Sequence, residues 1–146
     1  MNIRERLVNS GHLVFRSESQ KEDLLDVTKT KIALVENLSY LVEVHGHHLE
    51  ITAIKSDHRD DRDLGPHCHY NGFCADYYPL RSAKEGAYMS PDTLVFSTFL
   101  GHVARSPRIY EVGLTPEAWS WKNRTALLGV TIFPDSGGPH IHNGVH

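Results

Sequence analysis

The chain has 146 residues, a length typical of one domain and sufficient to bury a core without disulfides. Its 15 Lys and Arg against 18 Asp and Glu give a net charge of −3, which argues against a general nucleic-acid backbone binder. The 40% hydrophobic content excludes a disordered chain, and no stretch of about 18 apolar residues indicates a membrane span. Histidine is the unusual feature, because the chain has 11 of them and imidazole is the commonest metal ligand.

The N-terminal part predicts one long helix followed by a strand. Residues 1–18 form an extension with a short amphipathic segment that ends at Gly11. Ser19 and Glu22 have the spacing of a capping box, and apolar residues then recur every three or four positions. We therefore expect one helix from residue 19 to Gly46, which has the residue type of a helix C′ position. Residues 49–54 alternate and are β-branched, which is typical of a strand.

The rest of the chain predicts a charged loop, a second long helix and several strands. The loop covers residues 55–72, and Ser90 followed by Pro91 marks the start of the helix. A helical turn is expected to begin at Pro116. Strands are expected at residues 109–114, 125–133 and 140–145. This order of elements indicates an α+β fold in which helices pack on one face of a small antiparallel sheet.

Two short segments have the spacing of metal ligands. His69 and Asp76 stand seven positions apart with a glycine between them, and His140 and His142 stand two apart. Residues two apart in a strand point to the same face. Two histidines and one aspartate suit Zn²⁺ and leave a fourth position for water, as in catalytic zinc sites. The remaining histidine would act as a base or stabilise charge beside that water. The spacing alone leaves open which of His140 and His142 is the ligand.

These segments resemble the zinc D,D-peptidases and L,D-endopeptidases of bacterial peptidoglycan, whose fold the Hedgehog signalling domain shares. The family pattern is Ser-x-His-x-x-Gly-x-Ala-x-Asp followed by His-x-His, and residues 67–76 and 140–142 are similar to it. The resemblance implies a Hedgehog/DD-peptidase-like fold for a single domain, 1–146. It implies the following roles: Zn²⁺ binding by His69, Asp76 and His142, and assistance to catalysis by His140.

A further match lies in the charged loop. Residues 56–59 resemble the family's Ser-Gly-Tyr-Arg turn, which implies that Arg59 binds a carboxylate or the backbone of the substrate. The chain departs from the family pattern at two positions, because His67 replaces the serine and Cys74 replaces the alanine. Some members also have an acid three or four residues before the final histidine pair, and here the nearest acid is Asp135.

The resemblance implies a zinc metallopeptidase that cleaves the peptide stems of peptidoglycan, as an endolysin or a carboxypeptidase does. The N-terminus has no apolar segment of a signal peptide, so we expect synthesis in the cytoplasm. Small members of this kind are bacteriophage lysis enzymes, which implies action at the cell wall after release, or within a virion. We expect a monomer with no nucleic-acid or membrane partner. The alternatives are a non-catalytic zinc-binding module of the same fold, with a structural or binding role, and a metallohydrolase with another substrate.

Several residues near the predicted site have more than one interpretation. Cys68 and Cys74 suit a reducing cytosol and do not form a disulfide framework. They could instead bind a structural zinc ion, or Cys74 could be a small buried residue beneath the site. His67 is either a loop residue or a further ligand. We interpret Asp135 as a turn-forming residue rather than a catalytic acid.

The other histidines and the tryptophans are assigned to the surface or the core. Three histidines lie at the end of the expected long helix, where we expect solvated positions: His45, His47 and His48. His102 lies in the second helix, where we expect a hydrogen-bonded core position. Trp119 and Trp121 either line a groove or cover the sheet.

Overall fold

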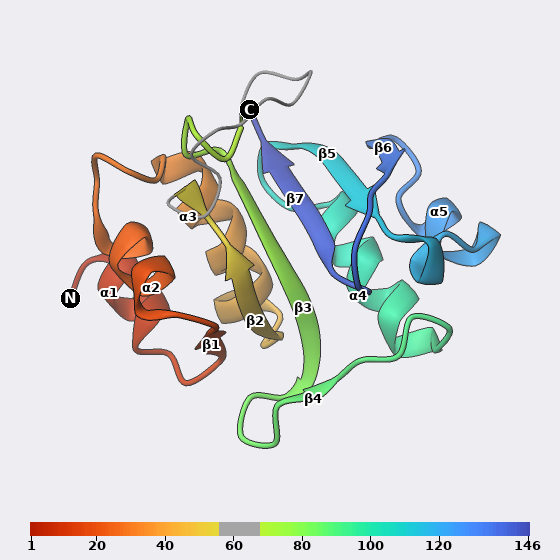
Figure 1. Cartoon of the computed structure of the whole chain (residues 1–146), viewed down its shortest axis with the longest axis horizontal. Helices are drawn as coiled ribbons and strands as arrows, with labels where there is room; N and C mark the ends of the chain where they lie inside the picture. Colours follow the sequence, from red (N-terminus) through yellow and green to blue (C-terminus); the bar gives the residue numbers. More distant parts are fainter. Residues whose placement is uncertain (56–67) are drawn as a thin grey trace.

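The computed structural model describes residues 1–55 and 68–146, which form one mixed sheet with helices against it (Figure 1). The sheet has seven strands in the order β1-β2-β3-β7-β5-β6, and β4 pairs with β3. The strands are β1 (Leu13–Phe15), β2 (His48–Ala53), β3 (Cys74–Ser82), β4 (Ala87–Tyr88), β5 (Ile109–Leu114), β6 (Thr131–Pro134) and β7 (Ile141–Val145). The expected α+β class is confirmed. The sheet is not antiparallel throughout, because β1 pairs with β2, and β5 with β6, in parallel.

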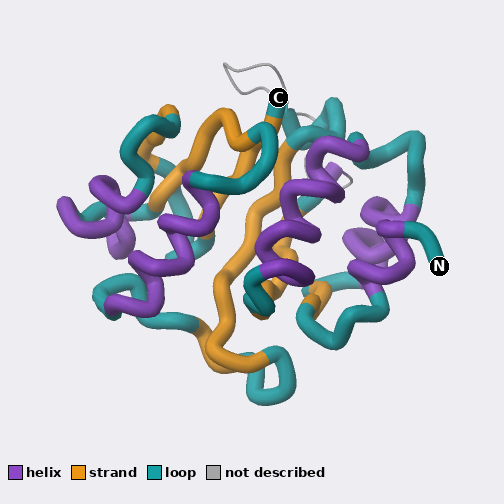
Figure 2. The backbone as a smooth tube through the Cα atoms, turned by 180° about the vertical axis from the view of Figure 1, so that it is seen from behind, coloured by secondary structure: helices purple, strands orange, loops and turns teal. Residues whose placement is uncertain are grey.

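Helices pack against this sheet and beside its two edges (Figure 1). They are α1 (Ile3–Val8), α2 (Glu18–Leu25), α3 (Ile32–Ser39), α4 (Leu94–Ala104) and α5 (Trp121–Ala126), with a π-helical turn η1 (Tyr40–Val44) and a 3₁₀ turn η3 (Pro116–Ala118). Seen from behind, α3 and α4 lie in front of the strands (Figure 2). Leu38 of α3 and Phe99 of α4 belong to the same buried cluster as Tyr77 of β3 and Ile141 of β7. Because side chains alternate along a strand, the neighbours of Tyr77 and Ile141 point to the opposite face.

The expected helix from residue 19 to Gly46 is wrong in two respects. It begins earlier, because Ser17 is the N-cap and its backbone N–H donates to Gln20 Oε1 at 3.0 Å. It is also broken between α2 and α3, where Asp26 is extended and its carboxylate accepts from the backbone N–H of Thr28 at 2.8 Å. Such a side-chain turn competes with the helix for backbone groups. The expected end is confirmed, because Gly46 follows η1 with a φ of +68°.

Arg4 of α1 donates hydrogen bonds to backbone carbonyls around the break between α2 and α3. Its guanidinium donates to the carbonyl oxygens of Leu24 at 2.9 Å and Thr30 at 2.6 Å. Arg4 is only 6% exposed, so these bonds satisfy a buried charge and two buried carbonyls together. The segment 1–18 therefore supplies both α1, which holds the α2–α3 turn, and β1, which pairs with β2.

Two further boundaries differ from expectation. Thr93, not Ser90, caps α4, and its hydroxyl accepts from the backbone N–H of Phe96 at 3.3 Å. The strand expected at 125–133 is wrong over its first half, because α5 extends to Ala126 and β6 begins only at Thr131. Ser120 caps α5 through the N–H of Asn123, which starts a helix where β-branched residues suggested a strand. The strand at 109–114 and the turn from Pro116 are confirmed.

Candidate metal centre

The pairing of β3 with β7 brings Asp76 and His142 together. The two residues are direct partners in the antiparallel register, so their side chains lie side by side on the face away from the helices. The Nδ1 atom of His142 lies 3.1 Å from Asp76 Oδ1, and the Nε2 atom of His69 lies 3.3 Å from the same oxygen. The ligand atoms of all three residues lie within 4.8 Å of one another. The structure thus brings together the three residues that the sequence predicts as ligands, and the group could hold a metal ion.

A tight turn before β3 positions His69. The carbonyl of His69 accepts from the N–H of Gly72 at 3.0 Å, and the carbonyl of Gly72 accepts from the N–H of Lys31 at 3.0 Å. Gly72 has a φ of +81°, and a Cβ atom there would lie 2.5 Å from the carbonyl oxygen of Lys29. Only glycine fits this conformation and this close approach. The turn is therefore attached to the start of α3 through Gly72, and it places His69 beside Asp76 of β3.

All three candidate ligands are buried. His69 is 3% exposed, Asp76 9% and His142 8%. Burial lowers the pKa of the His142 imidazole, but hydrogen bonds to Asp76 and Glu111 outweigh it and raise this pKa to about 9. Without a metal, His142 therefore holds a proton that balances the Asp76 carboxylate. A metal ion would displace this proton, so binding should release it to solvent.

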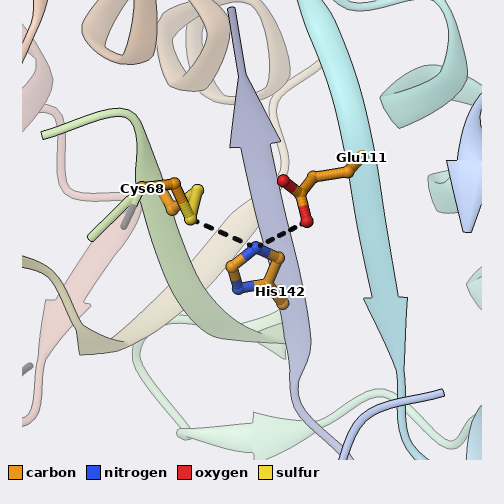
Figure 3. A group of neighbouring side chains, drawn as sticks. Cys68, Glu111 and His142 are labelled. Carbon is orange, nitrogen blue, oxygen red and sulfur yellow. Dashed lines mark hydrogen bonds and ion pairs between the residues drawn. A yellow bond between two sulfur atoms is a disulfide. The ribbon is translucent and has the colours of Figure 1, made fainter. Parts of the chain in front are cut away.

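Glu111 is a neighbour of the centre that the sequence reasoning missed. It lies on β5, and its Oε2 atom is 3.5 Å from His142 Nε2 (Figure 3). Gly144 of β7 makes room for it, because a Cβ atom at that position would lie 2.7 Å from Glu111 Cγ. Carboxylates on the far nitrogen of a metal-binding histidine orient the ring and raise its basicity. Alternation puts Glu111 and Gly113 on one face of their strand, but only the pairing of β5 with β7 places that face beside His142.

The two cysteines form a disulfide, which corrects the expectation of free thiols. Cys68 and Cys74 are six positions apart, and the loop that their bond closes contains His69. Cys74 is fully buried, as the sequence suggested. The Sγ atom of Cys68 lies 3.6 Å from His142 Nε2, on the same side of the ring as Glu111 (Figure 3). With the disulfide formed, neither sulfur is a thiolate ligand.

His140 pairs with Asp135 and is not a member of the ligand group. Its Nε2 atom lies 3.0 Å from Asp135 Oδ2, and its Nδ1 atom lies 3.0 Å from the carbonyl oxygen of Gly138. Both ring nitrogens face acceptors, an arrangement that favours the imidazolium form. The hydrogen bond to Asp135 raises the pKa of His140 despite partial burial, and the same bond lowers the pKa of Asp135. The Asp135 carboxylate also accepts from the N–H of Ser136 at 2.8 Å, so the residue interpreted as turn-forming orients His140 as well.

Arg59 and His67 lie outside the described residues, so their predicted roles stay predictions.

Five other histidines of the described residues contact one another in two groups instead of being separately solvated: His45, His47 and His102, and His12 with His48. His47 Nε2 lies 2.7 Å from His102 Nδ1, and the ring of His45 stacks on His102 with 3.8 Å between centroids. His48 Nδ1 lies 3.1 Å from His12 Nδ1. Burial, followed by the charges of its histidine neighbours, lowers the pKa of His47 to about 4. The expectation of solvated histidines is therefore wrong for His47, and the core position expected for His102 is a partly buried pairing with it.

An apolar pocket adjoins the Asp135–His140 pair. It has a volume of about 320 Å³ and is lined by Leu114, Pro116, Trp119 and Pro134. Asp135 directly follows Pro134, and its N–H donates to the carbonyl of Leu114 at 2.8 Å. Trp119 thus lines a groove, whereas Trp121 is 74% exposed.

A scan against protein-family models found no match to this chain, and a search of curated proteins found no similar sequence.

Proposed function

We propose that this chain is a zinc-dependent peptidase that cleaves the peptide stems of bacterial peptidoglycan. The convergence of His69, Asp76 and His142 is the main support. Ligand atoms around a tetrahedral zinc ion lie about 3.4 Å apart, from bond lengths near 2.1 Å. Here Asp76 Oδ1 lies 3.3 Å from His69 Nε2 and 3.1 Å from His142 Nδ1. Two imidazoles and a carboxylate are the ligand types found in catalytic zinc sites.

The fold we propose is a variant of the Hedgehog/DD-peptidase fold. The order of elements supports it: helices α2 and α3, strand β2, the turn with His69, β3 with Asp76, α4, β5 and finally β7 with His142. Asp76 and His142 are partners on the neighbouring strands β3 and β7, which also agrees with a shared metal site for these two residues.

In the proposed mechanism the chain's own residues bind and polarise the substrate. A bound zinc ion would supply acidified water and polarise a carbonyl oxygen. His140, held as an imidazolium by Asp135 at 3.0 Å, would stabilise negative charge that develops on the substrate oxygen. The apolar pocket beside Asp135 would accept an aliphatic part of the peptide stem. Arg59 is predicted to bind a substrate carboxylate.

The setting we propose is the bacterial cell wall, reached after release from the cytoplasm or within a virion, with the chain acting as a monomer. We propose no nucleic-acid or membrane partner. Within residues 1–55 and 68–146, the helices lack the length and apolar character that a membrane span requires.

A second candidate function is a non-catalytic zinc-binding module of the same fold. The burial of the ligands supports it, because His69, Asp76 and His142 are 3%, 9% and 8% exposed. A catalytic ion needs a position that the substrate can reach. In this alternative the metal would stabilise the β3–β7 pairing and leave peptide bonds intact.

Mass spectrometry of muropeptides distinguishes the two functions. Purified cell walls of several chemotypes are incubated with the zinc-loaded protein, with and without a chelator. We expect new cleavage products that a chelator abolishes and added zinc restores. His140→Ala should lower the rate by about 100-fold or more, in the range of general acid–base effects, without lowering bound zinc. His146→Ala is the matched control, because His146 is exposed. Zinc binding without cleavage of any wall would refute the peptidase and support the module.

A further inference from the structure

We propose that reduction of the Cys68–Cys74 disulfide creates a second metal site, formed by both thiolates, Glu111 and the Nε2 atom of His142. This inference does not depend on the proposed hydrolytic activity. It concerns the same histidine as the first centre but the opposite side of its ring.

The four side chains already lie within coordinating reach of one another. One ligand atom from each of Cys68, Cys74, Glu111 and His142 can be chosen so that all lie within 4.8 Å. The Nε2 atom of His142 is 3.6 Å from Cys68 Sγ and 3.5 Å from Glu111 Oε2 (Figure 3). Two sulfurs, one oxygen and one nitrogen make a complete tetrahedral set, which differs from the three-ligand set on the other side of the ring.

Both sulfurs have positions that the backbone maintains without the disulfide. Cys74 belongs to β3 and pairs with Gly144 of β7. The carbonyl of Cys68 accepts from the N–H of Phe73 at 2.8 Å, which closes the turn independently of the sulfur atoms. The thiols of the reduced protein therefore stay close to Glu111 and His142. Reduction therefore converts the two sulfurs into possible metal ligands while the backbone keeps both cysteines near their present positions.

The reduction requires a dithiol. A thiolate of the dithiol attacks Sγ of Cys68, the more exposed of the two cysteines, and Cys74 leaves as a thiolate. The second thiol of the reductant then attacks the mixed disulfide and releases Cys68. The dithiol loses two electrons and becomes a disulfide, and the chain gains two thiols. Coordination of a divalent ion replaces the two thiol protons, which pass to solvent.

The two sites compete for His142. Its Nδ1 atom faces Asp76 at 3.1 Å, and its Nε2 atom faces Glu111 and Cys68. A neutral imidazole has one unprotonated nitrogen, so it can serve one of the two sites at a time. Thiolates are the softer ligands, and the reduced set has three negative ligands where the first set has one. Reduction should therefore transfer a single bound ion from the first site to the second.

Cobalt(II) binding to the full-length chain tests this inference. Protein with the disulfide intact is compared with protein reduced by a dithiol, which is removed under argon before Co²⁺ is added. We expect thiolate-to-cobalt charge-transfer absorption in the near ultraviolet only from the reduced protein. Glu111→Gln should weaken Co²⁺ binding in the reduced state by at least about 10-fold, because it removes one of the four ligands, whereas loss of a carboxylate that only supports a ligand already costs about that much. Exposed Glu117, changed to Gln, is the matched control.

Two variants separate this site from the first. His69→Ala removes only the three-ligand set, so the reduced variant should retain the thiolate absorption. Changing both cysteines to serine removes only the second set, and this variant should bind Co²⁺ without thiolate absorption, which also shows that it folds. The proposal is overturned if the reduced wild-type chain shows no thiolate absorption, or if Glu111→Gln leaves its affinity unchanged. Neither result depends on cleavage of peptidoglycan.

Discussion

Tyr77→Phe tests the buried polar network that joins β3, β7 and α3. The Tyr77 hydroxyl donates to Asn143 Oδ1 at 2.8 Å, and Asn143 Nδ2 donates to Asn37 Oδ1 at 3.0 Å. All three residues are fully buried. Burial also raises the pKa of Tyr77, so its hydroxyl keeps its proton and remains a donor. The substitution removes one donor and leaves a buried amide oxygen without that partner.

The expected loss can be worked from this geometry. An unsatisfied buried acceptor costs about 1–3 kcal/mol in the free energy of unfolding. Unfolding entropy of about 2.1 cal/mol/K per residue, over 146 residues, gives about 0.3 kcal/mol/K. The midpoint of thermal unfolding should therefore fall by about 3–10 °C. Metal affinity should change little, because Tyr77 points to the helix side of the sheet and Asp76 to the other.

Differential scanning calorimetry and urea unfolding measure this loss. Tyr110→Phe is the matched control, because Tyr110 is 51% exposed, and its loss should stay within about 0.5 kcal/mol. An unchanged midpoint in Tyr77→Phe would refute the argument that this hydrogen bond stabilises the β3–β7 pairing.

Three further predictions concern the turn that contains His69 and Gly72, the binding of zinc, and the contacts among histidines. Gly72→Ala should lower both stability and metal affinity, because its φ is +81° and its Cβ would lie 2.5 Å from Lys29 O; calorimetry and metal titration check this, and wild-type affinity would contradict the role given to the turn. Zinc at about 100 times its dissociation constant should stabilise the protein by about 2.7 kcal/mol, an effect that His69→Ala should abolish in the disulfide-bonded protein; equal stabilisation of the variant in thermal unfolding would mean that His69 is not a ligand. Since the pKa of His47 is about 4 in the folded protein and its ordinary value is 6.5, the unfolded chain takes up the proton first, and stability should fall as the pH drops from 6.5 towards 4. Unfolding midpoints measured across this range should fall less in His47→Gln, and identical slopes would show that His47 is not responsible.

Short sequence patterns correctly predicted those helices, strands and turns that are determined by neighbouring residues in the chain. The strand at 109–114, the turn from Pro116 and the glycine at position 46 follow from alternation, proline geometry and left-handed backbone. The long helix was misjudged because its interruption depends on Arg4, which reaches the carbonyl of Thr30 from 26 positions away. Apolar periodicity continues through such a break and does not reveal it.

At the candidate site, too, features set by neighbouring residues could be predicted, whereas features set by the pairing of distant strands could not. Spacing within the chain indicated His69 with Asp76, and the strand period indicated that His140 and His142 share a face. The choice of Asp76 as the neighbour of His142 depends on the register between β3 and β7, which no local pattern specifies. Glu111 was missed because a glutamate in an alternating strand is indistinguishable from a solvated residue until β5 is placed beside β7. A cysteine pair six positions apart has no spacing that identifies a disulfide.

The place of β7 in the sheet has a consequence for how the chain folds. In the described part of the chain, β7 is the strand that pairs with both β3 and β5, so it joins β1–β4 to β5–β6. Without β7, strands β3 and β5 would each present an unpaired edge that could pair with another chain. The pairing of β7 with β3 and β5 covers both edges and joins distant parts of the sequence, and such long-range pairings slow folding in general. A metal ion held by Asp76 and His142 would slow the escape of this strand, and would therefore protect the protein against unfolding as well as shift its equilibrium stability.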